Sequence, residues 1–223
     1  LDSIASGPAA PDLFTAEDAL AVVKKYKLKL NSTISSYLEK ETPKTLDNVE
    51  SVITGSVRTL CQSAAGIAKA LGYTPYILCD DMNCEARDAG RLVSAMARRI
   101  GRDYYSFEPP CALILGGETV VHLKGKGKGG RNQELVLAAA EGIAGMEKVL
   151  IFSVGSDGSD GPTDAAGGIV DGKTAECLKA KGLKLQEILD NNDAYHGLEA
   201  INALVKTGPT GTNVNDIAVI LYG

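Results

Sequence analysis

The fold of this chain is decided at Val149-Leu-Ile-Phe-Ser-Val154, an apolar run that leads directly into Gly155-Ser-Asp-Gly-Ser-Asp-Gly-Pro-Thr-Asp-Ala-Ala-Gly-Gly-Ile-Val-Asp-Gly172. The first run predicts a buried strand because it is short, apolar and rich in β-branched residues. The second run holds six glycines and four aspartates in eighteen residues. Such a loop at the C-terminal end of a strand offers carboxylates to Mg²⁺ or to hydroxyl groups. The alternative is a solvated turn in which the aspartates form turns and caps.

Strands and helices are predicted to alternate around this segment. Further apolar runs predict strands at residues 49–54, 75–79, 112–115, 119–123 and 217–221. Helical periodicity and caps predict helices over residues 16–26, 31–41, 58–71, 85–100, 133–143, 172–181, 185–191 and 195–205. The alternation predicts an α/β fold in which parallel strands are joined by crossover helices. Because residues 104–110 have the composition of a linker, we predict two α/β units, residues 1–107 and 108–223.

Composition excludes several classes of function. The 223 residues carry a net charge of −5, which argues against a nucleic-acid partner. No apolar run approaches the roughly 18 residues of a membrane-spanning helix, so no membrane partner is expected. The cysteines form no Cys-x-x-Cys pair, which favours reduced thiols in a cytoplasmic protein over disulfides or a zinc site.

A basic, glycine-rich segment, Lys124-Gly-Lys-Gly-Lys-Gly-Gly-Arg-Asn-Gln-Glu134, joins a predicted strand to a predicted helix. Gly125, Gly127 and Gly130 satisfy the dinucleotide pattern G-x-G-x-x-G in the setting that it requires. Four cations interleaved with these glycines favour a highly charged, transferring phosphate over the pyrophosphate of NAD. An exposed basic loop without a ligand remains the third interpretation.

Other polar segments are ambiguous when each is taken alone. Thr207-Gly-Pro-Thr-Gly-Thr-Asn-Val-Asn-Asp216, just before the last predicted strand, offers many short donors and acceptors, or forms a tight turn. Asn191-Asn-Asp193 ends a predicted helix with the same ambiguity. Glu118, at the turn after Gly116-Gly117, is either a ligand-binding carboxylate or a surface turn residue.

In their order along the chain these segments resemble the MOFRL domain, the C-terminal domain of the second class of glycerate kinases. The resemblance spans residues 110–223 and is carried by Gly116-Gly-Glu-Thr119, the segment 125–134, the segment 155–167, Asn191-Asn-Asp193 and the segment 207–216. The opening Leu1-Asp-Ser-Ile-Ala-Ser-Gly-Pro8 is similar to the end of the same family's N-terminal domain. The resemblance implies that residues 1–107 are the C-terminal part of a Rossmann-like domain with a parallel sheet, and that residues 108–223 are a smaller MOFRL α/β domain with a mixed sheet.

The resemblance implies phosphorylation of D-glycerate to 2-phosphoglycerate, with ATP and Mg²⁺ as cofactors. Arg131 is expected to stabilise charge on the transferring phosphoryl group, because a guanidinium fits two phosphate oxygens. One of Asp157, Asp160 and Asp164 is expected to hold Mg²⁺, directly or through water. A further carboxylate, with Glu118 and Asp157 as the catalytic candidates, is expected to orient the 2-hydroxyl group and accept its proton.

Binding roles follow for the remaining motif residues. Phosphate or nucleotide is expected at Lys126, Gly127, Lys128, Gly129, Gly130, Asn132, Thr210, Gly211, Thr212 and Asn213. Glycerate is expected at Ser6, Gly7, Asn192 and Asp193.

Two other functions remain open at this point. A hydroxypyruvate reductase using NAD(P)H would need an acidic residue about 20 positions after the glycines; Glu147 and Asp157 lie 17 and 27 residues after Gly130, which does not decide the matter. A non-catalytic module would bind without turnover. Most of the family's N-terminal domain, including a lysine thought to be needed for catalysis, has no counterpart here. We therefore expect this chain alone to be inactive and its partner to be the N-terminal remainder of the same protein. Assembly of the protein into a homo-oligomer is a further possibility.

Overall fold

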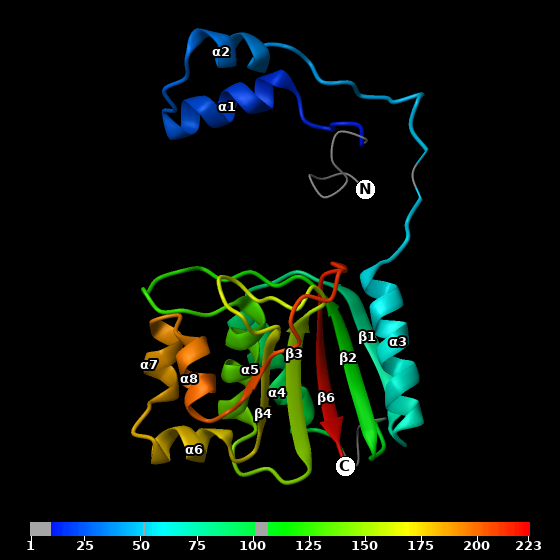
Figure 1. The fold of residues 1–223 in the computed structure, drawn as a ribbon, viewed down its shortest axis with the longest axis vertical. Coiled ribbons are helices and arrows are strands. Elements are labelled where there is room, and N and C mark those ends of the chain that lie inside the picture. The colour runs from blue at the N-terminus through cyan, green and yellow to red at the C-terminus, as the bar shows by residue number, and fades with distance from the viewer. Residues whose placement is uncertain (1–9, 51, 101–106) are drawn as a thin grey trace. The chain divides into compact units, whose positions relative to one another are not determined.

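The computed structural model describes residues 10–50, 52–100 and 107–223 and divides into two compact units, Leu1–Thr54 and Gly55–Gly223 (Figure 1). The first unit contains two helices, α1 (Ala16–Tyr26) and α2 (Ser32–Leu38). Thr15 caps α1, as predicted, by accepting from the Asp18 amide at 3.2 Å. The strand predicted over residues 49–54 is wrong, because the described residues of this stretch pair with no other strand and Val52 and Ile53 are exposed.

The second unit is built on one mixed sheet, which confirms the α/β class. Its strand order is β1-β2-β6-β3-β4-β5. The strands are β1 (Thr74–Met82), β2 (Cys111–Gly117), β3 (Val149–Gly155), β4 (Gly167–Asp171), β5 (Leu204–Val205) and β6 (Asp216–Tyr222). Among the strands of the described residues, only β1 and β2 pair in parallel, so the predicted parallel strands are confirmed for this pair and wrong for the others, which are antiparallel. The last strand, β6, lies between β2 and β3 and runs antiparallel to both.

Helices cover the two faces of this sheet unequally. They are α3 (Val57–Ala70), α4 (Ala86–Ala97), α5 (Arg131–Gly142), α6 (Thr174–Ala180), α7 (Leu185–Asp190) and α8 (Ala194–Ala200). Helices α4 and α5 pack on one face and form the larger core with Leu113, Leu115 and Ile151. Helix α3 packs on the opposite face in a smaller core (Figure 1).

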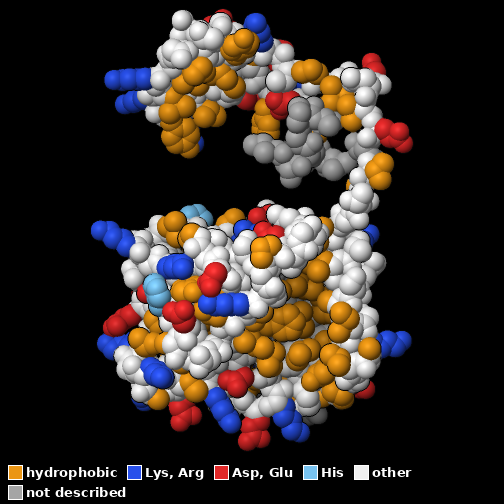
Figure 2. All heavy atoms as spheres, viewed as in Figure 1, with side chains coloured by type: hydrophobic (Ala, Val, Ile, Leu, Met, Phe, Trp, Pro, Cys, Tyr) orange, Lys and Arg blue, Asp and Glu red, His pale blue; other side chains and the backbone are white. Residues whose placement is uncertain are grey.

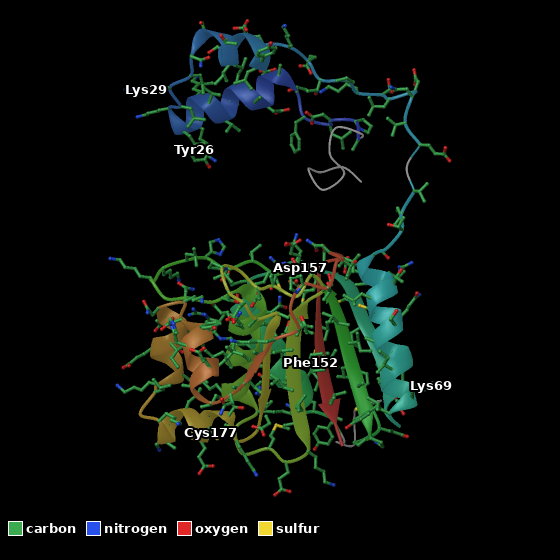
Figure 3. The ribbon with its side chains drawn as sticks, viewed as in Figure 1. Tyr26, Lys29, Lys69, Phe152, Asp157 and Cys177 are labelled. Atoms are coloured by element: carbon green, nitrogen blue, oxygen red, sulfur yellow. The ribbon has the colours of Figure 1, made fainter. Side chains whose placement is uncertain are left out.

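The face that carries α3 is only partly covered. Figure 2 shows apolar side chains gathered beside α3 on this face. Phe152, which Figure 3 labels, is only partly buried there, as are Val154 and Leu221. The alternation of buried and half-buried residues along β3 follows from this one-sided covering.

Three features differ from the sequence-based expectations. Residues 119–123 form no strand, and Val120 makes only an isolated bridge with Glu85. Strands β4 and β5 were not expected, because β4 begins with two glycines and β5 has two residues. The predicted boundary between residues 107 and 108 lies inside the second unit, where β1 and β2 belong to one sheet, so the division into two family domains stays a prediction.

No helix in the described part of the chain is long and apolar enough to span a membrane. All five cysteines are free, in agreement with the expected thiols.

Gly90 on α4 lets this helix approach α5 closely. A Cβ atom at Gly90 would lie 2.2 Å from the Leu135 carbonyl oxygen, whereas a Cβ atom at Gly66 on α3 would meet nothing within 4 Å. We expect Gly90→Ala to lower the free energy of unfolding by roughly 1–3 kcal/mol through overpacking. Gly66→Ala, the matched control, should raise it by up to about 1 kcal/mol. Urea unfolding followed by circular dichroism measures both, and an unchanged Gly90→Ala variant would contradict the packing.

Candidate active site

The candidate site lies where several strand ends meet. The C-terminal ends of β1, β2 and β3 lie at one end of the sheet, and β6 begins at the same end because it is antiparallel to β2 and β3. The glycine-rich segment, the acidic loop after β3 and the loop before β6 therefore gather there (Figure 1), and Figure 3 labels Asp157 in this region. This topology brings together segments that are far apart in the sequence.

A hollow of about 550 Å³ opens between these strand ends. Carboxylates, amides and a guanidinium share its lining with apolar groups, and such a mixture suits a small polar ligand. Its walls are formed by Asp81, Met82, Asn83, Gly117, Glu118, Thr119, Val120, Arg131 and Asn215.

Arg131 begins α5 and reaches into this hollow. Its Nε and Nη2 donate to the two oxygens of Asp216 at 2.5 and 3.0 Å, and its Nη1 lies 3.3 Å from Glu118. The hydrogen bonds to Asp216 raise the pKa of the Arg131 guanidinium further. Since Asp216 is buried and fixed at the start of β6, it holds the guanidinium in one orientation. The structure thus brings together Arg131 and Glu118, two of the predicted catalytic residues.

Asp160 serves the fold rather than the hollow. Its two carboxylate oxygens accept from the amides of Asn132 and Gln133 at 3.1 and 2.9 Å, so it caps α5 from a distant loop. Gly130, the residue before α5, has no side chain for this purpose. Burial raises the pKa of Asp160 to about 6, although the hydrogen bonds from Gln133 and Asn132 oppose this shift.

The other two aspartates of the acidic loop have separate surroundings. Asp164 accepts from the Tyr195 hydroxyl at 2.7 Å and from Lys206 at 2.8 Å. The Lys206 hydrogen bond, followed by that of Tyr195, lowers the pKa of this exposed carboxyl to about 2. One oxygen of Asp157 accepts from the Ser159 amide at 2.8 Å, and the second has no partner in the described part of the chain. Of the three predicted metal ligands, only Asp157 therefore keeps an uncommitted carboxylate oxygen.

The described residues contain no group of three or more His, Cys, Asp or Glu side chains arranged to hold a metal ion. A site formed jointly by the three aspartates does not fit this structure, and the expectation that one of them holds Mg²⁺ stays a prediction. A Mg²⁺ ion that is held through one or two carboxylates and completed by phosphates and water needs fewer protein ligands.

The glycine-rich segment is shaped by the turn after α7. Asn192 Oδ1 accepts from the amides of Lys124 and Gly125 at 2.8 and 2.9 Å. The side chains of Asn191 and Asp193 accept from the amides of Lys126 and Lys128 at 3.1 and 2.8 Å. Asn192 Oδ1 and Asp193 Oδ1 are therefore engaged within the protein, and the substrate contacts at these two residues stay predictions.

The glycines of this segment permit close packing against the same turn. A Cβ atom at Gly125 would lie 2.2 Å from the Asn191 carbonyl oxygen, and one at Gly127 would lie 2.4 Å from Asp193 Cβ. A Cβ atom at Gly130 would meet the Asp160 carboxylate at 2.2 Å. These three glycines therefore allow close packing of the protein on itself, and phosphate binding by the segment stays a prediction.

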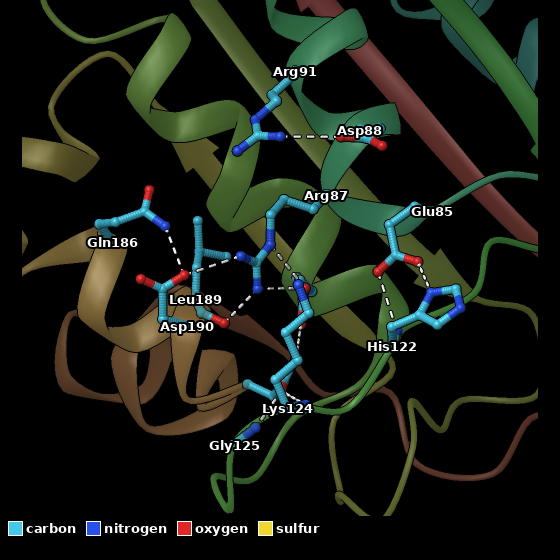
Figure 4. A network of polar contacts seen from close by, with 12 residues as sticks. Glu85, Arg87, Asp88, Arg91, His122, Lys124, Gly125, Gln186, Leu189 and Asp190 are labelled. Carbon is cyan, nitrogen blue, oxygen red and sulfur yellow. Dashed lines mark hydrogen bonds and ion pairs between the residues drawn. The ribbon is translucent and has the colours of Figure 1, made fainter.

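A buried ion pair anchors the turn after α7 (Figure 4). Arg87 on α4 binds Glu134 on α5 at 3.0 Å, and it also donates to the Leu189 carbonyl oxygen. The second oxygen of Glu134 accepts from Asn192 Nδ2 at 3.1 Å. This network connects α4 and α5 to the side chain that shapes the glycine-rich segment.

The remaining predicted binding residues lie around the hollow without lining it. Asn132 is buried and accepts from the Ser153 hydroxyl at 2.6 Å. The Lys128 ammonium lies 4.0 Å from the centre of the Tyr195 ring, while Lys126 is exposed. No protein acceptor is found in the described residues for the amides of Gly129 and Gly130, which leaves two donors before α5.

The loop before β6 packs on the acidic loop. The Thr210 amide donates to the Asp157 carbonyl oxygen at 3.2 Å, and the Ser156 hydroxyl accepts from the Val214 amide at 2.7 Å. Gly211, Thr212 and Asn213 are exposed at its tip. Ser6 and Gly7 lie outside the described residues.

Two residues of the site, Asp81 and Asn83, were not predicted from the sequence, and Asn215 and Asp216 were noted only as part of the ambiguous segment 207–216. Asp216 directly precedes an apolar strand, and Asp81 and Asn83 follow one, so their position at strand ends was the available signal. Only the folded sheet shows that these ends meet.

Residues 111–216, which carry the glycine-rich segment, the acidic loop and the loop before β6, match the MOFRL family. This part of the chain is a MOFRL family domain. Residues 1–39 match a domain of unknown function, DUF4147.

Named relatives are similar over nearly the whole chain. A D-glycerate 2-kinase of Thermotoga maritima is 50% identical over 98% of this chain and 52% of its own length. A glycerate 2-kinase of Pyrococcus horikoshii is 38% identical over 99% of this chain and 52% of its own length. A crystal structure of Thermotoga maritima glycerate kinase matches with a TM-score of 0.86 at 48% identity, covering 100% of this chain and 54% of that one. The chain thus spans about half the length of these relatives.

The raised pKa of Asp160 predicts a pH-dependent stability. The folded protein holds a proton on this carboxyl up to about pH 6, whereas the ordinary pKa is 3.8. The contribution of Asp160 to the free energy of unfolding is therefore largest below about pH 4 and is lost as the pH rises to about 6. The Asp160→Asn variant has no titrating group at this position and therefore lacks this contribution. Its side-chain NH2 group would face the backbone amide of Gln133, so that two hydrogen-bond donors meet.

We therefore expect the stability advantage of the natural protein over Asp160→Asn to be greater at pH 5 than at pH 7.5, by on the order of 1 kcal/mol. Urea unfolding at both pH values measures it, since other titrating groups cancel in the difference. An advantage that grows toward pH 7.5 would show that the folded state favours the ionised carboxyl.

Proposed function

We propose that the protein containing this chain transfers the γ-phosphoryl group of ATP to D-glycerate and forms 2-phosphoglycerate. The observation that carries this proposal is the Arg131 guanidinium, which Asp216 holds rigidly in a polar hollow beside Glu118. Similarity over nearly the whole chain to proteins named glycerate 2-kinase supports the same reaction.

Arg131 acts on the transferring phosphoryl group. Phosphoryl transfer concentrates charge on equatorial oxygens, and a preorganised cation stabilises that charge without reorganising during the reaction. The ion pair with Asp216 fixes the guanidinium in advance, while Nη1, at 3.3 Å from Glu118, can exchange this contact for a phosphate oxygen. Lys126, Lys128 and the free amides of Gly129 and Gly130 add positive charge and donors before α5.

Glu118 is the proposed carboxylate for the acceptor hydroxyl group. It is half-exposed at the wall of the hollow, and its ion pair places it next to the phosphoryl-binding guanidinium. A carboxylate in this position orients a 2-hydroxyl group and takes its proton as the new bond to phosphorus forms. Asp157 remains a second carboxylate for the same region.

Mg²⁺ is proposed to accompany ATP. When bound, the ion neutralises the charge that develops on the phosphates. In the acidic loop only Asp157 has an oxygen available for it, directly or through water. Phosphate oxygens of the nucleotide would complete the coordination shell.

The structure weighs against the alternative of an NAD(P)H-dependent hydroxypyruvate reductase. In a dinucleotide fingerprint the glycines leave room for a pyrophosphate. Here Gly125 and Gly127 pack on the turn after α7, and Gly130 packs on Asp160. Relatives from Agrobacterium vitis that are named, provisionally, hydroxypyruvate reductase are 36% and 34% identical.

The rest of the protein completes the active site in this proposal. Relatives extend to about twice the length of this chain, and the N-terminal remainder is the proposed partner. A homo-oligomer and a cytoplasmic location stay predictions.

Phosphorus NMR of the full-length protein with ATP, Mg²⁺ and D-glycerate tests the function. We expect a glycerate-dependent phosphomonoester signal of 2-phosphoglycerate, and no such signal from this chain alone. If a folded full-length protein transfers no phosphoryl group, the kinase proposal is rejected. Oxidation of NADH by hydroxypyruvate would then favour the reductase, and binding without turnover would favour a non-catalytic module.

Arg131→Ala in the full-length protein should lower kcat by roughly 10²-fold or more, because the charge on the transferring group loses its fixed donor. Arg131→Lys, which keeps a charge beside Asp216 but loses the paired donors, should recover only part of the rate. Arg91→Ala, which removes an exposed ion pair with Asp88, is the matched control and should leave kcat unchanged. Unaltered turnover in Arg131→Ala would remove this residue from the mechanism.

A further inference from the structure

The turn after α7 binds all the backbone amides of residues 124–128. Asn192 Oδ1 accepts from the first two amides, and the side chains of Asn191 and Asp193 accept from those of residues 126 and 128. The remaining amide, that of Gly127, donates to the Asn191 carbonyl oxygen at 2.8 Å. Residues 124–128 belong to no helix or strand, so this one turn fixes the course of their backbone.

This binding pattern ends at Gly129 and Gly130. Both residues are half-buried, and their amides have no acceptor in the described part of the chain. They directly precede Arg131, which begins α5 and lines the hollow. Because the two free donors follow residues 124–128 along the chain, a displacement of that stretch would move them as well.

Glu134 determines the direction in which the Asn192 amide group faces. A carboxylate only accepts hydrogen bonds, so Asn192 must present its NH2 group, and Nδ2 lies 3.1 Å from Glu134 Oε2. Asn192 Oδ1 is thereby turned toward the amides of Lys124 and Gly125. The other carboxylate oxygen, Oε1, accepts from Arg87 Nη2 at 3.0 Å, which keeps the carboxylate from rotating (Figure 4).

The burial of this ion pair favours a role in positioning. The side chains of Glu134 and Arg87 are 3% and 16% exposed. In a buried ion pair the cost of desolvation offsets much of the attraction, so well-packed apolar residues would stabilise the core about as well. A carboxylate that a guanidinium holds in place supplies an acceptor of defined direction, which an apolar residue cannot supply.

We propose that Asn192 is a positioning residue for phosphoryl transfer, that Glu134 sets the direction of its amide group, and that both act through the backbone of the glycine-rich segment. The amides of Gly129 and Gly130, placed in this way, donate to phosphate oxygens of the nucleotide. The inference rests on the proposed function for this ligand. It differs from a direct contact between Asn192 and glycerate, which would affect the binding of that substrate alone.

Hydrogen exchange of the full-length protein, measured by mass spectrometry of peptides spanning residues 121–135, tests the hydrogen-bond network without turnover. In Glu134→Gln the new side chain must turn its oxygen toward Arg87, so its NH2 group faces Asn192 Nδ2 and two donors meet. Asn192 then no longer presents Oδ1 to the segment. We expect the amides of Lys124 and Gly125 to exchange about tenfold faster or more, because both lose their acceptor.

Asn192→Gly is the second variant, with a matched control elsewhere in the chain. Asn192 has a φ of 52°, which glycine adopts readily, so this substitution removes the side chain and keeps the backbone conformation. It should accelerate the same exchange. Asn202→Gly makes the same change at an exposed residue with a φ of 58°, and exchange at residues 124–128 should stay unchanged.

A double variant, Glu134→Gln with Asn192→Asp, provides a rescue because it exchanges the donor and the acceptor. The new glutamine keeps an oxygen toward Arg87 and donates its NH2 group to the new carboxylate, whose other oxygen accepts from the segment. The net charge equals that of the natural protein. Protection from exchange should therefore recover in the double variant, although each single substitution impairs it. A loss of packing alone would predict no recovery.

Steady-state kinetics of the same full-length variants test the role in the reaction. Glu134→Gln and Asn192→Gly should lower kcat/KM for ATP by roughly 10-fold to 10²-fold, because small displacements of positioning groups have effects of this size. The KM for D-glycerate should change by less than about twofold, since the lost contacts belong to the nucleotide. The double variant should recover most of the lost kcat/KM, and Asn202→Gly should match the natural protein.

Four results overturn the inference. They are unchanged exchange in both single variants, faster exchange with unaltered kinetics, no recovery in a folded double variant, and a raised KM for D-glycerate alone in Asn192→Gly. The last result would assign Asn192 to substrate binding. Circular dichroism of each variant excludes loss of folding. If the natural full-length protein transfers no phosphoryl group, the proposed function fails and the role in this reaction fails with it, whereas the exchange experiment still decides whether Glu134 and Asn192 fix the segment.

Discussion

The position of β6 is the constraint on which the site depends. This strand lies between β2 and β3 and runs antiparallel to both, so its first residues meet the C-terminal ends of its neighbours. Asp216 therefore lies opposite Gly117 and Gly155 in the two pairings and beneath the start of α5. In an entirely parallel sheet, the beginning of β6 would lie at the other end and Arg131 would lose its buried partner.

Most polar residues of the site organise the protein itself. Asp160 caps a helix that has no capping side chain, and Asn192 shapes the glycine-rich segment. Such long-range hydrogen bonds give irregular loops defined positions, because buried backbone amides must find acceptors. Few groups then remain uncommitted, and these are concentrated at the hollow and at the two amides before α5.

The elements with a complete local pattern were predicted well. Helix α1 has its predicted bounds, and β3 and β6 lie where the short apolar runs indicated. The errors occurred where a local pattern depends on a partner. The described residues of the run at 49–54 pair with no strand, and β4 begins with glycines yet pairs with β3. The chemistry followed the same rule. Arg131 and Glu118 were predicted as site residues, and their side chains form an ion pair at the hollow. Asn192 and Asp160 were also predicted as site residues, but their side chains bind Glu134 and the start of α5.

The sequence by itself determined the α/β class, the MOFRL resemblance and the presence of basic, acidic and glycine-rich loops, because residue type and spacing are local properties of the chain. Only the tertiary structure decided which of these loops share a hollow, that β6 enters the sheet in the antiparallel direction, and that Asp81 and Asn215 face one space. The physical reason is that a carboxylate or an amide becomes a ligand only where the fold leaves it without a partner. That depends on contacts between residues separated by tens to more than a hundred positions, which no local pattern records.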